Sequence, residues 1–154
     1  MDLRGSQIFQ FQIEWPYVER VNLGFVGTFR RGEGRVTWNH QQVTMLTSEA
    51  GMGMLIKVAY PVADSPFAGS IQLADTIGPF FYGANGVANA LAVAVGLEYA
   101  FAEGWGITTS LQYRLFAGHE VAASTHQGIG DTTQSGWLVS HGAAALVGVK
   151  SVMF

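Results

Sequence analysis

The chain has 154 residues, of which 12% are charged, 12% are aromatic and 49% are hydrophobic. Soluble domains usually carry about 25% charged residues, so this chain has too few charges to cover a soluble domain of its length. The net charge of −3 provides no basic surface for nucleic acid, and the lack of cysteine excludes disulfides, thiolate metal sites and cysteine nucleophiles. A chain of this length is predicted to form a single domain, residues 1–154.

Most of the sequence alternates large apolar side chains with small or polar ones, which is the period of a β-strand. The predicted strands, in chain order, are Ser6–Trp15, Val18–Arg31, Arg35–Met45, Ala50–Tyr60, Phe67–Gly78, Leu91–Phe101, Trp105–Leu115 and Trp137–Phe154. The sixth and seventh strands, on either side of Ala102–Gly104, form the clearest hairpin. One face of this hairpin is large and apolar, whereas the other is small and includes Glu98, Gln112 and Arg114.

The predicted connections differ between the two ends of the strands. Glycines predict a tight turn at Arg31–Gly34, and Pro61–Pro66 and Ala102–Gly104 are also short. The other end would carry the aromatic loop Gly78–Val87 and the long polar loop Gly118–Gly136. Short turns on one side and longer loops on the other are typical of outer-membrane barrels.

The alternation and the low charge predict an all-β fold, a closed antiparallel up-and-down transmembrane β-barrel of about eight strands. The longest apolar runs, Ala90–Leu97 and Gly142–Val149, are far shorter than the roughly 20 residues of a membrane-spanning helix. The alternative is a soluble lipocalin-like ligand-binding barrel with its large residues inside, but its outer surface would then consist of alanine and glycine. The start of the chain lacks the apolar core of a signal peptide, so an exported protein would be present here in a mature or altered form.

The last predicted strand ends on an aromatic residue. Phe154 shares its parity with Val152, Gly148 and Leu146, and this strand resembles the terminal signal of Gram-negative outer-membrane barrels. The resemblance implies that Phe154 is read by the barrel-assembly machinery. It also implies a location in the Gram-negative outer membrane, in contact with outer-membrane lipid and lipopolysaccharide.

Two places leave the strand register open. Lys150 stands where the outer-membrane pattern has an apolar residue. Either its side chain reaches the membrane interface, or a bulge switches the outward parity to Val147 and Val149. At His40–Gln42 the alternation is blurred, and a bulge or an early turn fits the stretch.

Several segments of the second half resemble the lipid A 3-O-deacylase (acyloxyacyl hydrolase-like) barrels. These segments are Ile77–Phe80, Val95–Tyr99, Phe101–Trp105 and Tyr113–Arg114. Enzymes of that family carry a His-x-Ser-Asn motif soon after the Tyr-Arg pair. This chain has Leu115–Glu120 at the matching place, with no serine two residues after a histidine. The resemblance therefore implies a related barrel that lacks the catalytic motif.

A hydrolase would have to use other residues. Ser124 is a candidate nucleophile, with His119 or His126 as the base and Glu120 as the orienting acid. The competing interpretation is a solvated extracellular loop, because catalysis requires side chains held on rigid elements. The histidines show no metal-ligand spacing, so no metal and no cofactor are predicted. His141 is expected to face inward as a hydrogen-bonded residue of the last strand.

Five charged residues lie on the non-lipid parity of their strands. They are Glu14, Arg30, Lys57, Glu98 and Arg114. The interior of a barrel of about eight strands is filled by side chains, so these residues are predicted to form a plug of ion pairs and hydrogen bonds. Glu98 and Arg114 are not expected to be direct partners. The alternative is a narrow small-solute pore, because the alanines of the sixth strand leave space.

The sequence thus favours a small outer-membrane barrel without catalytic activity. Its role would be structural, in surface interaction, or as a component of a larger complex with a protein partner. The predicted contact surface is Phe80, Phe81 and Tyr82 together with the loop Gly118–Gly136. The alternatives are a lipid A deacylase-like hydrolase, a narrow pore and the soluble lipocalin-like barrel.

Overall fold

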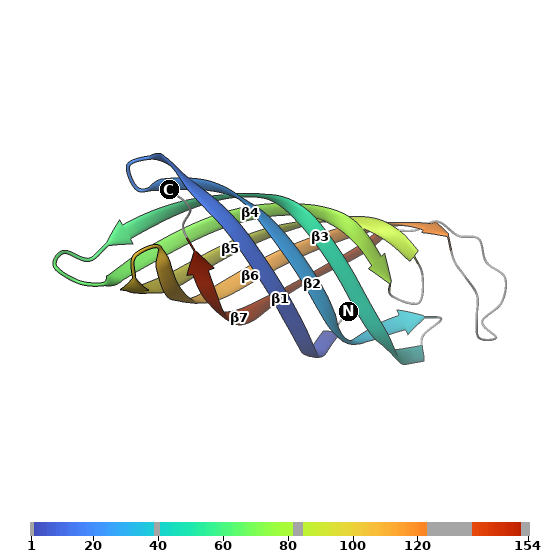
Figure 1. Cartoon of the computed structure of the whole chain (residues 1–154). Coiled ribbons are helices and arrows are strands. Elements are labelled where there is room, and N and C mark those ends of the chain that lie inside the picture. The colour runs from blue at the N-terminus through green and yellow to red at the C-terminus, as the bar shows by residue number, and fades with distance from the viewer. Residues whose placement is uncertain (1, 39–40, 82–84, 123–136, 152–154) are drawn as a thin grey trace.

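The computed structural model describes residues 2–38, 41–81, 85–122 and 137–151. These residues form one antiparallel sheet of seven strands in which each strand pairs with its neighbour in sequence (Figure 1). The strands are β1 (Asp2–Val18), β2 (Val21–Trp38), β3 (Gln41–Pro61), β4 (Phe67–Phe81), β5 (Asn85–Ala102), β6 (Trp105–Ala122) and β7 (Trp137–Ser151). The predicted all-β class and up-and-down order are confirmed.

The described part of the chain has seven strands, not about eight, because the predicted turn at Arg31–Gly34 does not form. β2 continues through this stretch and pairs with β3 without a register shift, from Val21 opposite Val58 to Trp38 opposite Gln41. The predicted third strand is therefore divided between the end of β2 and the start of β3. Glycine permits a turn but does not require one, and the long ladder to β3 keeps this stretch extended.

Two predicted loops are shorter than expected. Most of Gly78–Val87 is strand, because β4 extends to Phe81 and β5 begins at Asn85. The predicted loop Gly118–Gly136 starts inside β6, which ends at Ala122, and residues 123–136 lie outside the described chain. In both places cross-strand pairing to a neighbour overrides the local turn composition.

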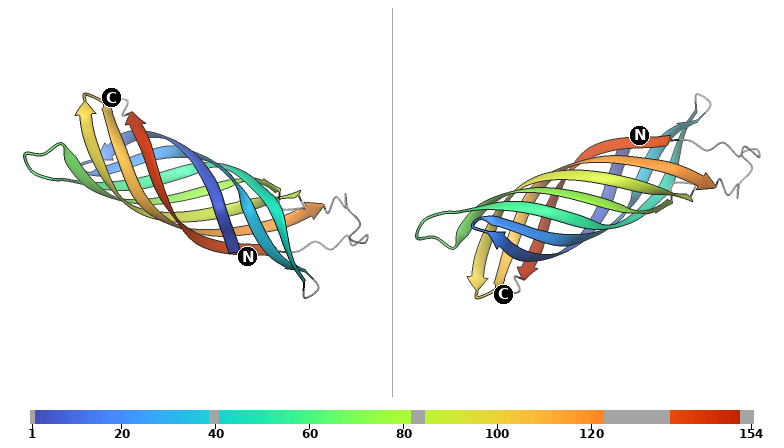
Figure 2. Two further views of the ribbon diagram at one scale, coloured as in Figure 1. Left: turned by 90° about the horizontal axis from the view of Figure 1, so that it is seen from below. Right: turned by 90° about the horizontal axis from the view of Figure 1, so that it is seen from above.

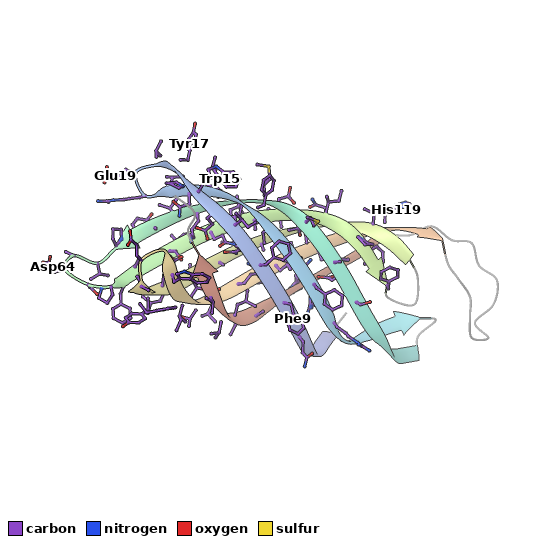
Figure 3. All side chains as sticks on the ribbon, in the orientation of Figure 1. Phe9, Trp15, Tyr17, Glu19, Asp64 and His119 are labelled. Atoms are coloured by element: carbon purple, nitrogen blue, oxygen red, sulfur yellow. The ribbon has the colours of Figure 1, made fainter. Side chains whose placement is uncertain are left out.

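The three turns at the opposite end of the sheet are short. They connect β1 to β2, β3 to β4, and β5 to β6, through residues 19–20, 62–66 and 103–104. The turns at residues 62–66 and 103–104 were predicted. The turn at residues 19–20 was not, because the sequence suggested a break at Pro16-Tyr17, between the predicted strands Ser6–Trp15 and Val18–Arg31. Arg20, Asp64 and Gly104 adopt positive φ values of 67°, 54° and 73° in these turns. We call this end the short-turn end; Glu19 and Asp64 mark it in Figure 3.

The strands wind around a common long axis (Figure 2). β1 and β7 are the two edges of the sheet. The chain reverses direction at each connection, and an even number of connections lies between β1 and β7, so the two edge strands run in the same direction. No backbone ladder joins these edges within the described residues, so the sheet is not closed. The start of β1 and the end of β7 consequently lie toward opposite ends of the long axis (Figure 1).

Candidate functional site: a polar interior behind an apolar exterior

The convex face of the sheet carries the large apolar side chains. Phe11, Met52 and Leu111 are 58%, 70% and 66% exposed there. Figure 3 shows Phe9, Trp15 and Tyr17 pointing away from the sheet along β1. The soluble lipocalin-like alternative required these residues to lie inside, so their position on the outer face contradicts it.

Aromatic side chains gather on the outer face near the short-turn end. They are Trp15, Tyr17, Tyr60, Phe67, Tyr99, Phe101 and Trp105. Neighbouring strands bring some of their rings together, with centroids 5.0 Å apart for Phe67 and Tyr99 and 5.5 Å apart for Trp15 and Phe25. Such distances allow favourable tilted ring packing. Aromatic side chains at one level of an apolar surface have the composition of a membrane interface.

The concave face holds a buried cluster of three charges from three strands. Lys57 on β3 is 2% exposed, and its Nζ lies 2.6 Å from the carboxylate of Glu14 on β1 and 2.7 Å from Oε1 of Glu98 on β5. The side-chain amide of Asn22 donates a further bond, 3.0 Å long, to Glu14 Oε2. These bonds cross the hollow of the sheet and fix β1 opposite β3 and β5. We call these three charged residues the Lys57 cluster.

A second ion pair lies further from the short-turn end. Arg114 on β6 donates a hydrogen bond to the carboxylate of Glu49 on β3, which is 4% exposed. Its guanidinium also lies 5.6 Å from the centroid of the Phe116 ring. Arg30 lines the same small interior space as Glu49 and Arg114. Arg114 thus pairs with Glu49 and not with Glu98.

Glu49 is the interior charge that sequence reasoning missed. It falls between two predicted strands, where the alternation was unclear, and so it had no assigned face. In the structure β3 is continuous through this point, and Glu49 shares its parity with Leu55 and Lys57, both buried. The sequence did contain a signal: Glu49 and Lys57 are separated by an even number of residues, so both lie on the same face if one strand runs through them without a break.

Glutamines connect β1 to strands on the far side of the interior. Gln12 Nε2 donates to Gln72 Oε1 on β4 over 3.1 Å, and Gln112 Nε2 on β6 lies 3.5 Å from Gln10 Oε1. These side chains line a cavity of about 100 Å³, together with residues of both edge strands. The cavity is polar and lies directly beyond the Lys57 cluster, since Glu14 and Glu98 form part of its wall.

Two phenylalanines close the interior beyond the second ion pair. Phe80 and Phe116 are each 2% exposed, and their rings meet edge to face with centroids 5.6 Å apart. Gly86 and Gly118 allow this packing, because a Cβ on either would come within 2.6 Å of the Phe80 ring. Phe80 is therefore an interior residue, which corrects its predicted place on a contact surface. Phe81 does face outward at 48% exposure, and Tyr82 lies outside the described residues.

The short-turn end of the interior is open by comparison. A cavity of about 480 Å³ lies there, with mainly small residues around it and Glu98 at its inner side. Its wall includes Ala59, Ala68, Ala100, Ala102 and Gly106. Along the axis the interior therefore runs from this apolar mouth through the Lys57 cluster, the glutamine cavity and the Glu49–Arg114 pair to the two phenylalanines.

Of the four candidate hydrolase residues, His119 alone has a described side chain. His119 lies in β6 and is exposed on its outer face (Figure 3). Glu120 lies in the same strand, whereas Ser124 and His126 lie outside the described residues. Among the side chains that the structure describes, no group of three or more histidine and carboxylate residues could hold a metal ion.

The last strand shows which parity faces outward. Val147 and Val149 are 79% and 71% exposed, while Leu146 and Gly148 are half-buried on the other face. Val147 and Val149 therefore face outward, but no bulge produces this parity, because β7 pairs with β6 without a register shift from Trp137 to Ser151, with Lys150 opposite Gly106. His141 is also exposed, 6.0 Å from the Tyr113 ring, which corrects its predicted inward position. Phe154 lies outside the described residues.

No protein-family model, curated protein or solved structure matches this chain. The described residues also contain no helix that is both long enough and apolar enough to cross a bilayer. The geometry of the two faces is therefore what bears on function.

Proposed function

We propose that this protein is a small outer-membrane β-barrel with a structural or complex-forming role and without catalytic activity. The observation that carries the proposal is the inverted polarity of the sheet. Phenylalanine, methionine, leucine and valine side chains are exposed on its outer face, while Glu14, Glu49 and Lys57 are buried within. Hydrocarbon is the solvent in which such an outer face is stable, and ion pairs then stabilise the interior.

In the proposed barrel, β1 and β7 pair directly along their edges. Unpaired backbone groups at a lipid-exposed edge each cost several kcal/mol, so a membrane-embedded sheet must close. Residues of both edges already line one cavity, the one that contains Gln10 and Gln12. Since the two edges run in the same direction, this pairing is parallel, unlike every other pair in the sheet.

We further propose that the barrel does not conduct. Three obstructions lie in series along its axis: the Lys57 cluster, the Glu49–Arg114 pair and the Phe80–Phe116 contact. A space of only about 10 Å³ lies on each side of the Glu49–Arg114 pair, one toward Gln10 and Gln112 and one toward Phe116. Neither is large enough for more than about one water molecule. This arrangement supports the plugged interior over the narrow pore.

Membrane insertion is tested by folding the protein into phosphatidylcholine vesicles and floating them on a density gradient. The expected result is comigration with the vesicles and a shift in SDS-gel mobility on boiling, as is usual for folded outer-membrane barrels. A monodisperse protein that stays folded without detergent and does not float would refute the membrane assignment. Bilayer recordings provide the second measurement, and discrete conductance steps from the wild-type protein would refute the plug.

Direct pairing of β1 with β7 is tested by cysteine crosslinking. The chain contains no cysteine, so no other disulfide can form. Phe11→Cys on β1 is combined with Val147→Cys or Val149→Cys on β7, all on the outer face. A disulfide in vesicles requires Cα atoms roughly 4.4–6.8 Å apart, the distance of paired strands. The control pair is Phe11→Cys with Val93→Cys on β5, which should not crosslink. Failure of both β1–β7 pairs in floated vesicles would rule out direct pairing.

A further inference from the structure

One carboxylate faces outward from the middle of a strand. Asp75 on β4 is exposed on the apolar outer face, in the same row as Leu73 and Ile77. Among the described side chains, every other carboxylate within a strand is on the inner face, and the remaining ones lie in the short turns. An ionisable side chain directed toward lipid is costly and marks a site of interaction.

Asp75 has one hydrogen-bond partner on the neighbouring strand. Asn89 on β5 is also exposed, and its Nδ2 donates to Asp75 Oδ1 over 2.7 Å. The rest of the surrounding surface is apolar: Met54 and Leu91 stand opposite Asp75 in the two ladders, and Ile77 and Ala117 stand opposite Asn89. The pair is thus a polar island in an apolar surface.

The island carries both unused donors and unused acceptors. The amide of Asn89 has two N–H groups and gives one to Asp75, and the carboxylate of Asp75 has a second oxygen with its own lone pairs. A surface that holds a donor beside an acceptor can bind a copy of itself related by a two-fold axis. With that axis parallel to the barrel axis, both copies keep the same orientation and the same depth in the membrane.

We propose that the outer face around Asp75 and Asn89 is the interface of a homodimer within the membrane. This inference depends on the proposed membrane location. Each Asn89 amide donates one bond to Asp75 of its own chain and one to Asp75 of the partner copy, so the two carboxylates are separated by amides. The surrounding Met54, Ile77 and Leu91 side chains exclude lipid from the bonds. Polar side chains hold membrane segments together in the same way when lipid offers no alternative partner.

The test uses the full chain in vesicles of phosphatidylcholine. A single dye is attached through Ala63→Cys, in the exposed turn between β3 and β4, and energy transfer between donor- and acceptor-labelled copies is measured at increasing protein-to-lipid ratio. The expected result is saturable energy transfer with a stoichiometry of two. Replacing Asp75→Leu and Asn89→Leu together should weaken dimerisation by roughly tenfold, because two interchain hydrogen bonds are lost.

Two further variants separate the polar contact from a general effect of the surface. Asp75→Asn removes the repulsion of the two carboxylates, and its new amide can donate to Asn89 Oδ1 of the partner copy where the second carboxylate oxygen accepted a bond, so its dimerisation should equal or exceed that of the wild type. Thr109→Leu removes an exposed polar side chain from the outer face of β6 and should leave energy transfer unchanged. If the protein floats with the vesicles but the wild type and the double-leucine variant give the same energy transfer, the dimer interface is wrong while the membrane assignment stands. A protein that does not float overturns both.

Discussion

Removal of the Lys57 ammonium is the sharpest test of the interior. In Lys57→Met the carboxylates of Glu14 and Glu98 lose a cation that lies within 2.7 Å of both. Glu14 has a side-chain exposure of 3%, so its carboxylate cannot regain full hydration without opening the sheet, whereas Glu98, at 12%, borders the cavity at the short-turn end. Breaking a buried ion pair by deleting one partner costs about 3–5 kcal/mol. We expect the free energy of unfolding to fall by about that amount.

The matched control restores neutrality without restoring the ion pairs. In the triple variant Lys57→Met, Glu14→Gln and Glu98→Gln, no charge is left buried in the cluster, so the penalty of an uncompensated buried charge is removed. We therefore expect the triple variant to recover most of the stability lost in Lys57→Met. A second control, Glu103→Gln in an exposed turn, should change the unfolding free energy by less than about 0.5 kcal/mol.

The measurement is urea unfolding in detergent micelles or vesicles, followed by the fluorescence of the tryptophans and by gel mobility. Two outcomes would refute the reasoning. One is a Lys57→Met variant within about 1 kcal/mol of the wild type, which would mean that the cluster is hydrated. The other is a triple variant no more stable than Lys57→Met, which would mean that lost packing and not unpaired charge is responsible.

Three further predictions concern packing and backbone, each measured in the same unfolding assay. Phe80→Ala should lower the free energy of unfolding by about 3–5 kcal/mol, because it leaves a cavity beside Phe116. Phe81→Ala removes an outward side chain and should lower it by less than about 1 kcal/mol. Equal effects of the two substitutions would contradict the inward position of Phe80. Arg20→Gly should stabilise the protein by about 1 kcal/mol, because a residue with a side chain is strained at a φ of 67°, and no gain would show that the turn is not strained. Gly53→Ala should lower the free energy of unfolding by more than about 1 kcal/mol, because the added Cβ would clash with the Asp75 carbonyl oxygen. At Gly142 an added Cβ would have no atom within 4 Å, so Gly142→Ala should leave the stability unchanged. The reverse order of effects would contradict the register of β3 on β4.

The faces of most strands could be predicted from the sequence, because side-chain direction in a strand follows from a local period of two. This applies to the apolar outer rows of β1, β5 and β6. It also applies to the inward position of Glu14, Lys57 and Glu98. No knowledge of neighbouring strands was needed, since the chemistry of alternate residues already separates the two faces.

The number of strands could not be obtained in this way. Gly32 and Gly34 are compatible with a turn and with a strand, and the local sequence does not distinguish the two. The ladder between β2 and β3 decides in favour of a strand. That decision also assigns Glu49 a face, and with it the partner of Arg114.

Tertiary structure likewise decided on which face of the sheet some side chains near strand ends lie. The three aromatics after Pro79 suggested a loop, yet pairing of β4 with β5 extends the strand and turns Phe80 toward Phe116. His141 faces outward because the register of β7 on β6 places it opposite Leu115. The sequence by itself determined that this chain forms strands with an apolar and a polar face, because that property is local. Strand count, register and the pairs formed across the interior depend on contacts between distant residues, and only the folded sheet decided them.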